Sequence, residues 1–223
     1  MVNYVGRVSD FTEVEEALRK PPQRLWERLR ADPLRAPEHV ALAASEYHGP
    51  AASAWADRRR RVYGTDPKTL AQMARRRHVN LASVEGAATG VGGFITLLPD
   101  LVGLAWIQSR LVFFVAAAYG FDPYDPMRPA ELLVLRDLYP DPQTARMALD
   151  GIGKTVAEAY VGSRIERERE QAVLSRLLQF VGKRTATRAA RRLIPGVGMA
   201  FNAVANERDT RALADRAIAF YGG

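Results

Sequence analysis

The sequence has 223 residues, 48% of them hydrophobic and 26% charged, which suits one large domain or a domain with an extension and excludes a disordered chain or a polytopic membrane protein. It contains no cysteine, which excludes disulfides, thiolate metal sites and cysteine nucleophiles. The formal net charge of +7 and the pI of about 10.0 point to an anionic partner, either a nucleic acid or a lipid surface.

The first third of the chain is predicted to be helical. Thr12 and Glu15 have the spacing of a capping box, and the helix that they start is expected to end at the prolines of 21–22. A short helix is expected over 23–30, and Pro37 is expected to open a longer helix that reaches Tyr63.

A helical hairpin is predicted over 67–120. Thr65 or Asp66 can cap its first helix, which is expected to run to Leu98 and to stop at Pro99. Asp100 can then cap the second helix, which is expected to end at Tyr119 and Gly120.

The rest of the chain also has helical spacing of its apolar residues. A helix is expected over 129–139, a long helical region over 142–193 that is weakest at its glycines, and a last pair over 195–206 and 207–221. The expected fold is therefore all-α, a multi-helix bundle built around two apolar helical hairpins. We expect an N-terminal helical extension over 1–64 and the main domain over 65–223.

The apolar stretch 101–119 is long enough to cross a bilayer, which takes about 20 residues. However, Arg110 lies at its midpoint, where an arginine costs about 2.5–3.5 kcal/mol in a membrane. If the hairpin folds at 98–100, Glu85 lies at the depth of Arg110 and can pair with it, and His78 lies beside Tyr119. The alternative is that Glu85 and Arg110 both face solvent. We expect a buried or reversibly exposed hairpin that rests on a membrane and does not span it. The hairpin tips over 94–102 and 197–201 are expected to dip into the membrane interface.

Small residues recur at helical spacing in both apolar segments. Such stripes let two helices approach closely, in a membrane pair or equally in a soluble core. The predicted helix-packing residues are Gly86, Gly90, Gly93, Gly196 and Gly198.

A basic cluster precedes each apolar segment. Anionic membrane surfaces attract such clusters, at about 1 kcal/mol per lysine or arginine near the surface. The alternative is a solvated basic helix face. The predicted lipid-binding or anion-binding residues are Arg75, Arg76, Arg77, Arg184, Arg188, Arg191 and Arg192.

The ordered set of the 86–93 glycines, the Asp100 turn, the Gln108–Arg110 neighbourhood, the PGVG turn at 195–198 and Asn206 resembles the EcsC family over about 65–222. The resemblance implies a bacterial, helical protein with apolar patches. The family takes its name from a gene beside an ABC-transporter operon linked to secretion and membrane proteolysis, which suggests an adaptor in secretion or membrane homeostasis. It implies no catalytic residues.

Four classes of function remain open, the fourth of them a protein-interaction scaffold. The arginines at 58–61 are a candidate contact for a nucleic acid or for a protein partner. We expect a non-enzymatic protein of the cytoplasmic side, since the N-terminus lacks the apolar run of a secretory signal, docked on the anionic inner face of the cell membrane. One alternative is a hydrolase-like enzyme with a pocket of His78, Asp100 and Arg110; another is a nucleic-acid-binding protein, which the separation of the tryptophans from the basic runs disfavours. The candidate polar core or ligand site comprises His78, Glu85, Asp100, Arg110, Asn202 and Asn206.

Cofactors and partners are predicted only in outline. The sequence has no P-loop, HExxH or dinucleotide fingerprint, and its three histidines are scattered, so we expect no cofactor and no bound metal. The expected partner is an anionic phospholipid membrane surface. A second copy of the chain, or a protein that docks on residues 1–64, is a further expected partner.

Overall fold

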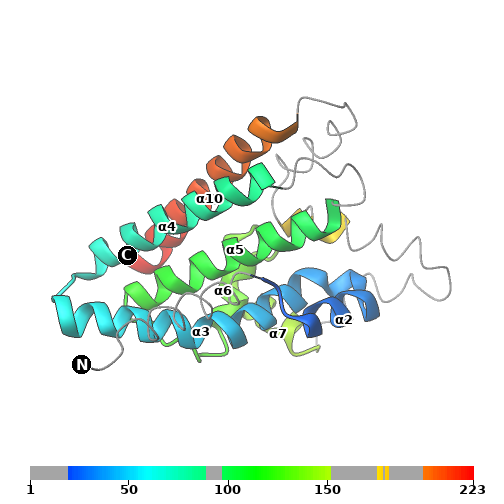
Figure 1. Ribbon diagram of the computed structural model, residues 1–223. Coiled ribbons are helices and arrows are strands. Elements are labelled where there is room, and N and C mark those ends of the chain that lie inside the picture. The colour runs from blue at the N-terminus through cyan, green and yellow to red at the C-terminus, as the bar shows by residue number, and fades with distance from the viewer. Residues whose placement is uncertain (1–19, 89–96, 152–174, 178, 181–197) are drawn as a thin grey trace, which may run out of the picture.

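The fold is seen in a computed structural model that describes residues 20–88, 97–151, 175–177, 179–180 and 198–223; within 84–100 and 198–205 the description covers the backbone alone. All regular secondary structure in these residues is helical, which confirms the all-α prediction. The elements, in chain order, are α2 (Gln23–Ala31), the 3-10 helix η1 (Pro33–Arg35), α3 (Ala36–Tyr63), α4 (Pro67–Ala88), α5 (Leu97–Ala118), α6 (Arg128–Leu135), α7 (Pro142–Leu149) and α10 (Gly198–Gly222) (Figure 1).

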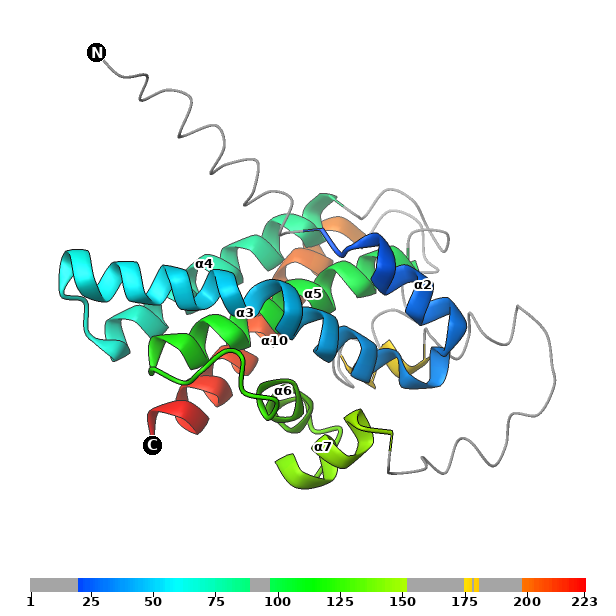
Figure 2. The same cartoon turned by 90° about the horizontal axis from the view of Figure 1, so that it is seen from below.

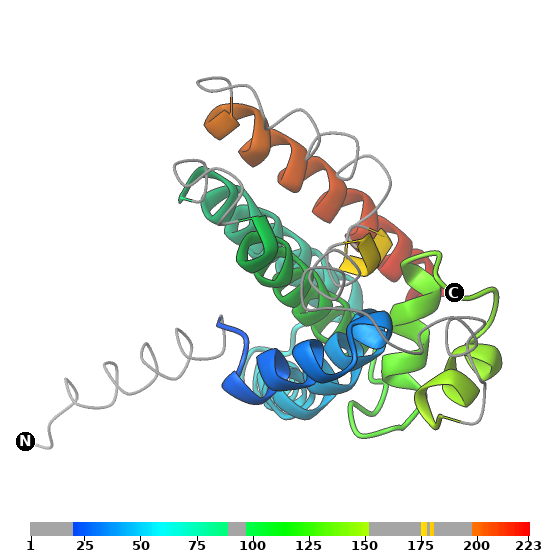
Figure 3. The same cartoon turned by 90° about the vertical axis from the view of Figure 1, so that its right-hand side faces the viewer.

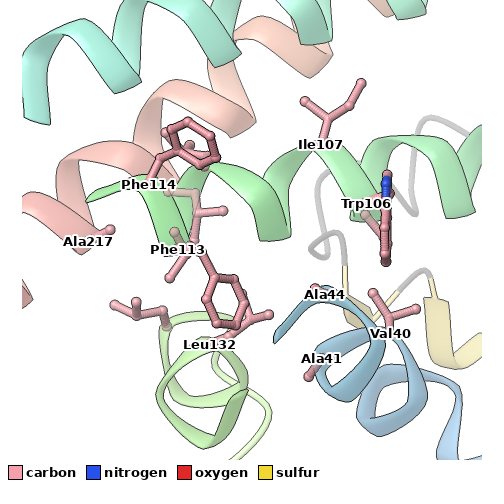
Figure 4. Close-up of a cluster of buried hydrophobic side chains, with 14 of the residues drawn as sticks. Val40, Ala41, Ala44, Trp106, Ile107, Phe113, Phe114, Leu132 and Ala217 are labelled. Carbon is pink, nitrogen blue, oxygen red and sulfur yellow. The ribbon is translucent and has the colours of Figure 1, made fainter. Parts of the chain in front are cut away.

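The apolar helix α5 forms the centre of the bundle. Helices α3, α4 and α10 pack against it on different sides, and α6 also contacts it (Figures 2 and 3). The close-up shows Trp106 of α5 over Val40 and Ala44 of α3, and Phe113 directed toward Leu132 of α6 (Figure 4). Among the described residues one stretch, Leu101–Ala118, is apolar and long enough to cross a membrane, and all of it is buried inside the protein. It is therefore the core helix of this bundle.

Local sequence signals explain where several helices begin and end. The Asp66 carboxylate accepts a hydrogen bond of 3.0 Å from the Thr69 backbone N–H at the start of α4, and Asp141 accepts one of 2.8 Å from Thr144 at the start of α7. Gly64 follows α3 with a φ of +61°, a left-handed conformation that glycine adopts without strain. The predicted cap at Asp66 is thus confirmed.

The hairpin of α4 and α5 turns earlier than predicted. Helix α4 ends at Ala88, and α5 already begins at Leu97, so Pro99 and Asp100 lie inside its first turn. The prediction that Pro99 stops a helix and that Asp100 caps the next one is wrong. A proline is accepted in the first turn of a helix because its missing N–H would have no partner there.

The end of the chain also differs from the prediction. The two helices expected over 195–206 and 207–221 are one continuous helix, α10. No glycine or proline interrupts the backbone near the expected junction, and Glu207 pairs with Arg211 one turn later. Helix α6 ends at Leu135, four residues before the expected end, and Asp137 after it has a φ of +57°. The helices predicted over 12–20 and over most of 142–193 lie outside the described residues.

The segment before residue 64 shares the hydrophobic core of the rest. Leu25 and Leu29 of α2 and the alanines of α3 belong to the same buried cluster as α5. Trp55 of α3 packs on Phe114 of α5, with ring centroids 5.3 Å apart. The predicted domain boundary at 64/65 coincides with the α3–α4 turn. The helices before this boundary nevertheless contribute to the core around the central helix.

Candidate functional site

Three polar residues in succession interrupt the apolar surface of α5. Gln108, Ser109 and Arg110 are all buried. The Ser109 hydroxyl donates to the Ala105 carbonyl within the helix, at 2.7 Å. Gln108 and Arg110 lie two residues apart and therefore on nearly opposite faces of the helix. Each of them belongs to a separate buried polar cluster.

The first cluster, here called the histidine cluster, comprises His48 of α3, His78 of α4 and Arg110 of α5. Both histidines are fully buried. The guanidinium of Arg110 lies 5.0 Å from the centre of the Phe114 ring, and the His78 ring lies 5.1 Å from the same ring. His48 packs on Trp106, with ring centroids 4.3 Å apart. The predicted neighbours His78 and Arg110 are thus brought together, and His48 was missed.

The two histidines of this cluster are neutral at pH 7. Burial lowers the pKa of His78 to about 3; the hydrogen bond to the Ala74 carbonyl opposes this shift, and the positive charges of Arg110 and Arg77 add to it. Burial, followed by the charge of Arg110, also holds the pKa of His48 well below its usual range. The Nδ1–H of His78 donates to the Ala74 carbonyl at 2.8 Å. A general base works best with a pKa near the working pH, so His78 is poorly suited to that role.

The predicted catalytic neighbour Asp100 does not join this cluster. Asp100 precedes Arg110 by ten residues on the same helix, which places their Cα atoms about 15 Å apart along the axis. His78 packs beside Phe114 and not beside Tyr119, as the shifted hairpin turn requires. The side chains of Glu85, Asp100 and Asn202 lie outside the described set, so the pairing of Glu85 with Arg110 stays a prediction.

The second cluster, here called the Arg136 cluster, comprises Gln108, Arg136 and Thr210. The Gln108 amide donates to the Thr210 hydroxyl at 3.0 Å, and its carbonyl oxygen accepts a hydrogen bond from Arg136. Asn206 is buried on α10, one turn before Thr210. Of this region the sequence predicted Asn206 only. The sequence feature that could have indicated Arg136 is its position directly after the apolar run LLVL of α6.

The predicted basic residues of α4 do not form one patch. Arg75 makes two hydrogen bonds to the carboxylate of Asp215 on α10, at 2.7 and 3.2 Å. Arg76 is exposed, and Arg77 is half-buried, which lowers its pKa. Consecutive residues point about 100° apart around a helix, so the three side chains diverge.

The remaining predicted residues are placed only in part. Gly86 lies in the last turns of α4, and Gly198 is the first residue of α10. The other basic and small residues of the prediction lie outside the described residues: Gly90, Gly93, Arg184, Arg188, Arg191, Arg192 and Gly196. In the described part of the chain no group of three or more histidine, aspartate or glutamate side chains is placed to hold a metal ion.

The arginine run at 58–61, predicted only as a contact for a nucleic acid or a protein partner, belongs to a basic surface that also exposes apolar side chains. It lies at the turn between α3 and α4, and we call residues 58–68 the α3–α4 corner. Val62 and Tyr63 are each 63% exposed, and Arg58, Arg61 and Lys68 are exposed beside them. The corner has five basic residues and one acidic residue, Asp66. The signal that could have found it is the run RRRRVY at the predicted end of a helix.

The α3–α4 corner is fixed to the central helix by Arg60. One guanidinium nitrogen of Arg60 donates to the carbonyls of Ala117 and Ala118, the C-terminal residues of α5, at 2.5 and 2.8 Å. The guanidinium of Arg59 lies 5.2 Å from the centre of the Tyr63 ring. The exposed side chains of the corner therefore stand on a rigid base.

Comparison with known proteins gives one family and one relative. The model of the EcsC protein family matches residues 60–222. The uncharacterized protein YdbA of Bacillus subtilis (strain 168) is 37% identical over 54 residues, which are 24% of this chain and 20% of that protein. The match thus spans about one fifth of the relative. No solved structure matches the chain.

Proposed function

The chain belongs to the EcsC family, and from that premise we propose that it is a non-enzymatic protein that docks reversibly on the anionic inner surface of the bacterial cell membrane, as an adaptor in secretion or membrane homeostasis. The observation that carries the proposal is the α3–α4 corner. There two large apolar side chains project into solvent from a basic surface.

The enclosure of α5 favours docking over spanning. Its apolar stretch is covered by other helices, and it contains the buried side chains of Gln108 and Arg110. Exposing these groups to lipid would cost several kcal/mol, mostly for the charge. Contact with a membrane is therefore expected through the surface of the bundle.

The chemistry of the corner suits an anionic lipid surface. Valine and tyrosine can enter the headgroup region, where the tyrosine hydroxyl stays hydrated. Arg58, Arg61 and Lys68 lie next to them, and each basic group near an anionic surface contributes about 1 kcal/mol. Together they support weak, salt-sensitive binding.

The corner and the predicted hairpin tips lie at opposite ends of α4. This helix has 22 residues and is about 33 Å long, with the corner before Pro67 and the hairpin turn after Ala88. Of the tip predicted over 94–102, Leu101 and Val102 are buried in the core. Variants at one end therefore leave the other end unchanged, so that mutation can separate the two alternatives.

The test is co-sedimentation of the purified chain with vesicles of phosphatidylcholine alone and of phosphatidylcholine mixed with phosphatidylglycerol. We expect binding to the anionic vesicles only, with loss of binding in high salt. Arg58→Ala/Arg61→Ala/Lys68→Ala should weaken binding by up to roughly a hundredfold. Val62→Ser/Tyr63→Ser should weaken it without changing the charge.

Two further variants decide what a loss of binding means. Arg24→Ala/Arg30→Ala/Arg208→Ala removes the same charge from exposed positions on α2 and α10 and should bind nearly normally. Arg188→Ala/Arg191→Ala/Arg192→Ala tests the basic cluster predicted from the sequence. If only this variant fails, docking occurs through the basic cluster at 184–192 and not through the α3–α4 corner. If the unmodified chain binds no vesicle, the proposed function is wrong.

A further inference from the structure

Arg136 is a charged side chain placed inside the protein. It follows the last turn of α6, where its backbone N–H bonds to the Leu132 carbonyl. Only 6% of the residue is exposed. Arginine stays protonated at neutral pH even here, although burial, followed by the positive charge of Arg216, lowers the pKa of Arg136 to about 9.

Two uncharged groups of the described residues are in direct contact with Arg136. One guanidinium nitrogen donates to the Gln108 side chain, and the Phe180 ring centre lies 4.8 Å from the guanidinium carbon. The Nε–H is buried and has no hydrogen-bond acceptor in the described part of the chain. Among the described residues the carboxylates of Asp209 and Asp137 favour the charged form of Arg136, and Arg216, which lies 3.9 Å from Asp137, opposes it more than either of them.

A guanidinium in this position is expensive unless an anion balances it. Buried charges in proteins are usually paired, because moving an ion out of water costs several kcal/mol. A ring and a neutral amide compensate only part of that cost. The remaining 6% exposure is the residue's contact with solvent.

Other donors surround the same position. The Thr210 hydroxyl is linked to Arg136 through Gln108, and the buried Asn206 amide lies one turn before Thr210 on α10. Hydroxyl, amide and guanidinium groups are the side chains that bind oxyanions, and a guanidinium edge matches two oxygens of one group. The three groups come from α6 and α10, with α5 between them.

We propose that Arg136, with Gln108 and the α10 residues Asn206 and Thr210, forms a binding site for a single oxyanion group, a phosphate or a carboxylate. The group belongs either to a free anion or to a lipid headgroup. This inference does not rest on membrane docking, because a free anion can occupy the site in solution.

The test is isothermal titration calorimetry of the full chain at constant ionic strength in chloride. The three probes are inorganic phosphate, acetate and dihexanoyl phosphatidic acid, which is soluble and carries a lipid headgroup. We expect saturable one-to-one binding of at least one probe. Binding of phosphatidic acid alone would assign the site to a lipid, and binding of a small anion would assign it to a free ligand.

Variants locate the binding at Arg136. Arg136→Met/Gln108→Leu removes both side chains of their shared hydrogen bond, together with the bond from Gln108 to Thr210, and should abolish the binding. Arg24→Met removes an exposed charge and should not change it. Arg136→Lys keeps the charge and loses the two-oxygen geometry, so affinity should fall by about tenfold.

The outcomes are distinguishable even if the double variant does not fold, because Arg136→Lys preserves the charge and can be checked by circular dichroism. If the unmodified chain binds none of the three probes, the proposal is overturned. It is also overturned if Arg136→Lys and the folded double variant both bind with unchanged affinity.

Discussion

Several arginines in the described part of the chain bind groups inside the structure. Arg60 donates to the last carbonyls of α5, and Arg35 donates to the Ala148 carbonyl at the end of α7, where a cation also complements the helix dipole. Arg128 lies over the rings of Phe121 and Tyr221, 5.0 and 5.6 Å from their centres. The net charge of +7 therefore overstates the charge available at the surface.

The Arg128 contact also fixes the end of α10. A guanidinium nitrogen of Arg128 lies 2.6 Å from the Glu131 carboxylate, which accepts a hydrogen bond of 2.7 Å from the Tyr221 hydroxyl. Burial raises the pKa of Glu131, and its bond to Tyr221 and the charge of Arg128 oppose that rise. The network joins α6 to the C-terminal turn of α10 through charged and aromatic groups together.

The buried histidines predict that the protein loses stability in acid. An unfolded histidine has a pKa of about 6.5, while His78 has one of about 3 and His48 one well below 6.5 in the fold. Below pH 6.5 the unfolded state therefore binds protons that the folded state does not. The free energy of unfolding should fall by about 1.4 kcal/mol per pH unit for each histidine between pH 6 and pH 4.

Substitution of His78 isolates its share of this slope. Asparagine can keep a donor near the position of Nδ1 and its bond to the Ala74 carbonyl, but it does not titrate. Urea unfolding of both proteins at several pH values should show a shallower pH dependence for His78→Asn, by about 1.4 kcal/mol per pH unit. Parallel curves would mean that His78 is accessible to protons in the folded state.

At the scale of helices, the local sequence predicts where a helix starts better than it predicts where the chain turns between two helices. The caps at Asp66 and Asp141 and the glycine at 120 act within one turn of the backbone, so the sequence near them is sufficient. Pro99 was ambiguous, because proline fits both the end of one helix and the first turn of the next. The continuity of α10 depends on its packing along α4 and α5, which no local pattern contains.

The candidate sites show the same limit. The hairpin predicted that His78 meets the second helix, but its register placed His78 beside Tyr119; the earlier turn places it beside Phe114 and Arg110. His48 and Arg136 could not be predicted, since they come from α3 and α6, and no short-range pattern specifies how these helices lie against α5. The basic residues of the α3–α4 corner are apparent in the sequence. Their position at the end of α5 is not, because it depends on the hydrogen bond from Arg60 to the Ala117 carbonyl.

Helix α3 is predicted to be indispensable, although it lies almost entirely before the residues that match the family. It covers Trp106 and Phe114, which are 0% and 2% exposed in its presence. A chain that begins at Gly64 would expose this face of α5 together with Arg110. We expect that chain to aggregate or to lose cooperative unfolding, as measured by light scattering and circular dichroism.

The matched control is a chain that begins at Lys20. It retains α2, α3 and every other described helix, so it should unfold cooperatively at a denaturant concentration close to that of the full chain. A soluble, cooperatively folded chain from Gly64 would show instead that the 65–223 segment is an independent domain.

For the whole molecule, the arrangement of helices resolves the ambiguity of the apolar segment. A helix with the composition of Leu101–Ala118 can lie in a bilayer or in a core, and sequence periodicity does not separate the two. Here α3, α4, α6 and α10 contact it, and their own apolar faces are buried by doing so. Inserting α5 into lipid would separate these helices from it and leave their apolar faces without a partner.

This arrangement predicts that the purified chain enters the aqueous phase when Triton X-114 is warmed above its cloud point. A protein whose apolar spanning segment faces lipid binds detergent there and enters the detergent phase, whereas a buried segment is inaccessible to the micelle. The exposed Val62 and Tyr63 are too small a patch to retain a 24.7 kDa protein in the micelles. Recovery in the detergent phase at neutral pH would show that α5 leaves the core. The same assay at pH 4 should shift part of the chain into detergent, because protonation of His48 and His78 opposes the packing of α3 and α4 on α5.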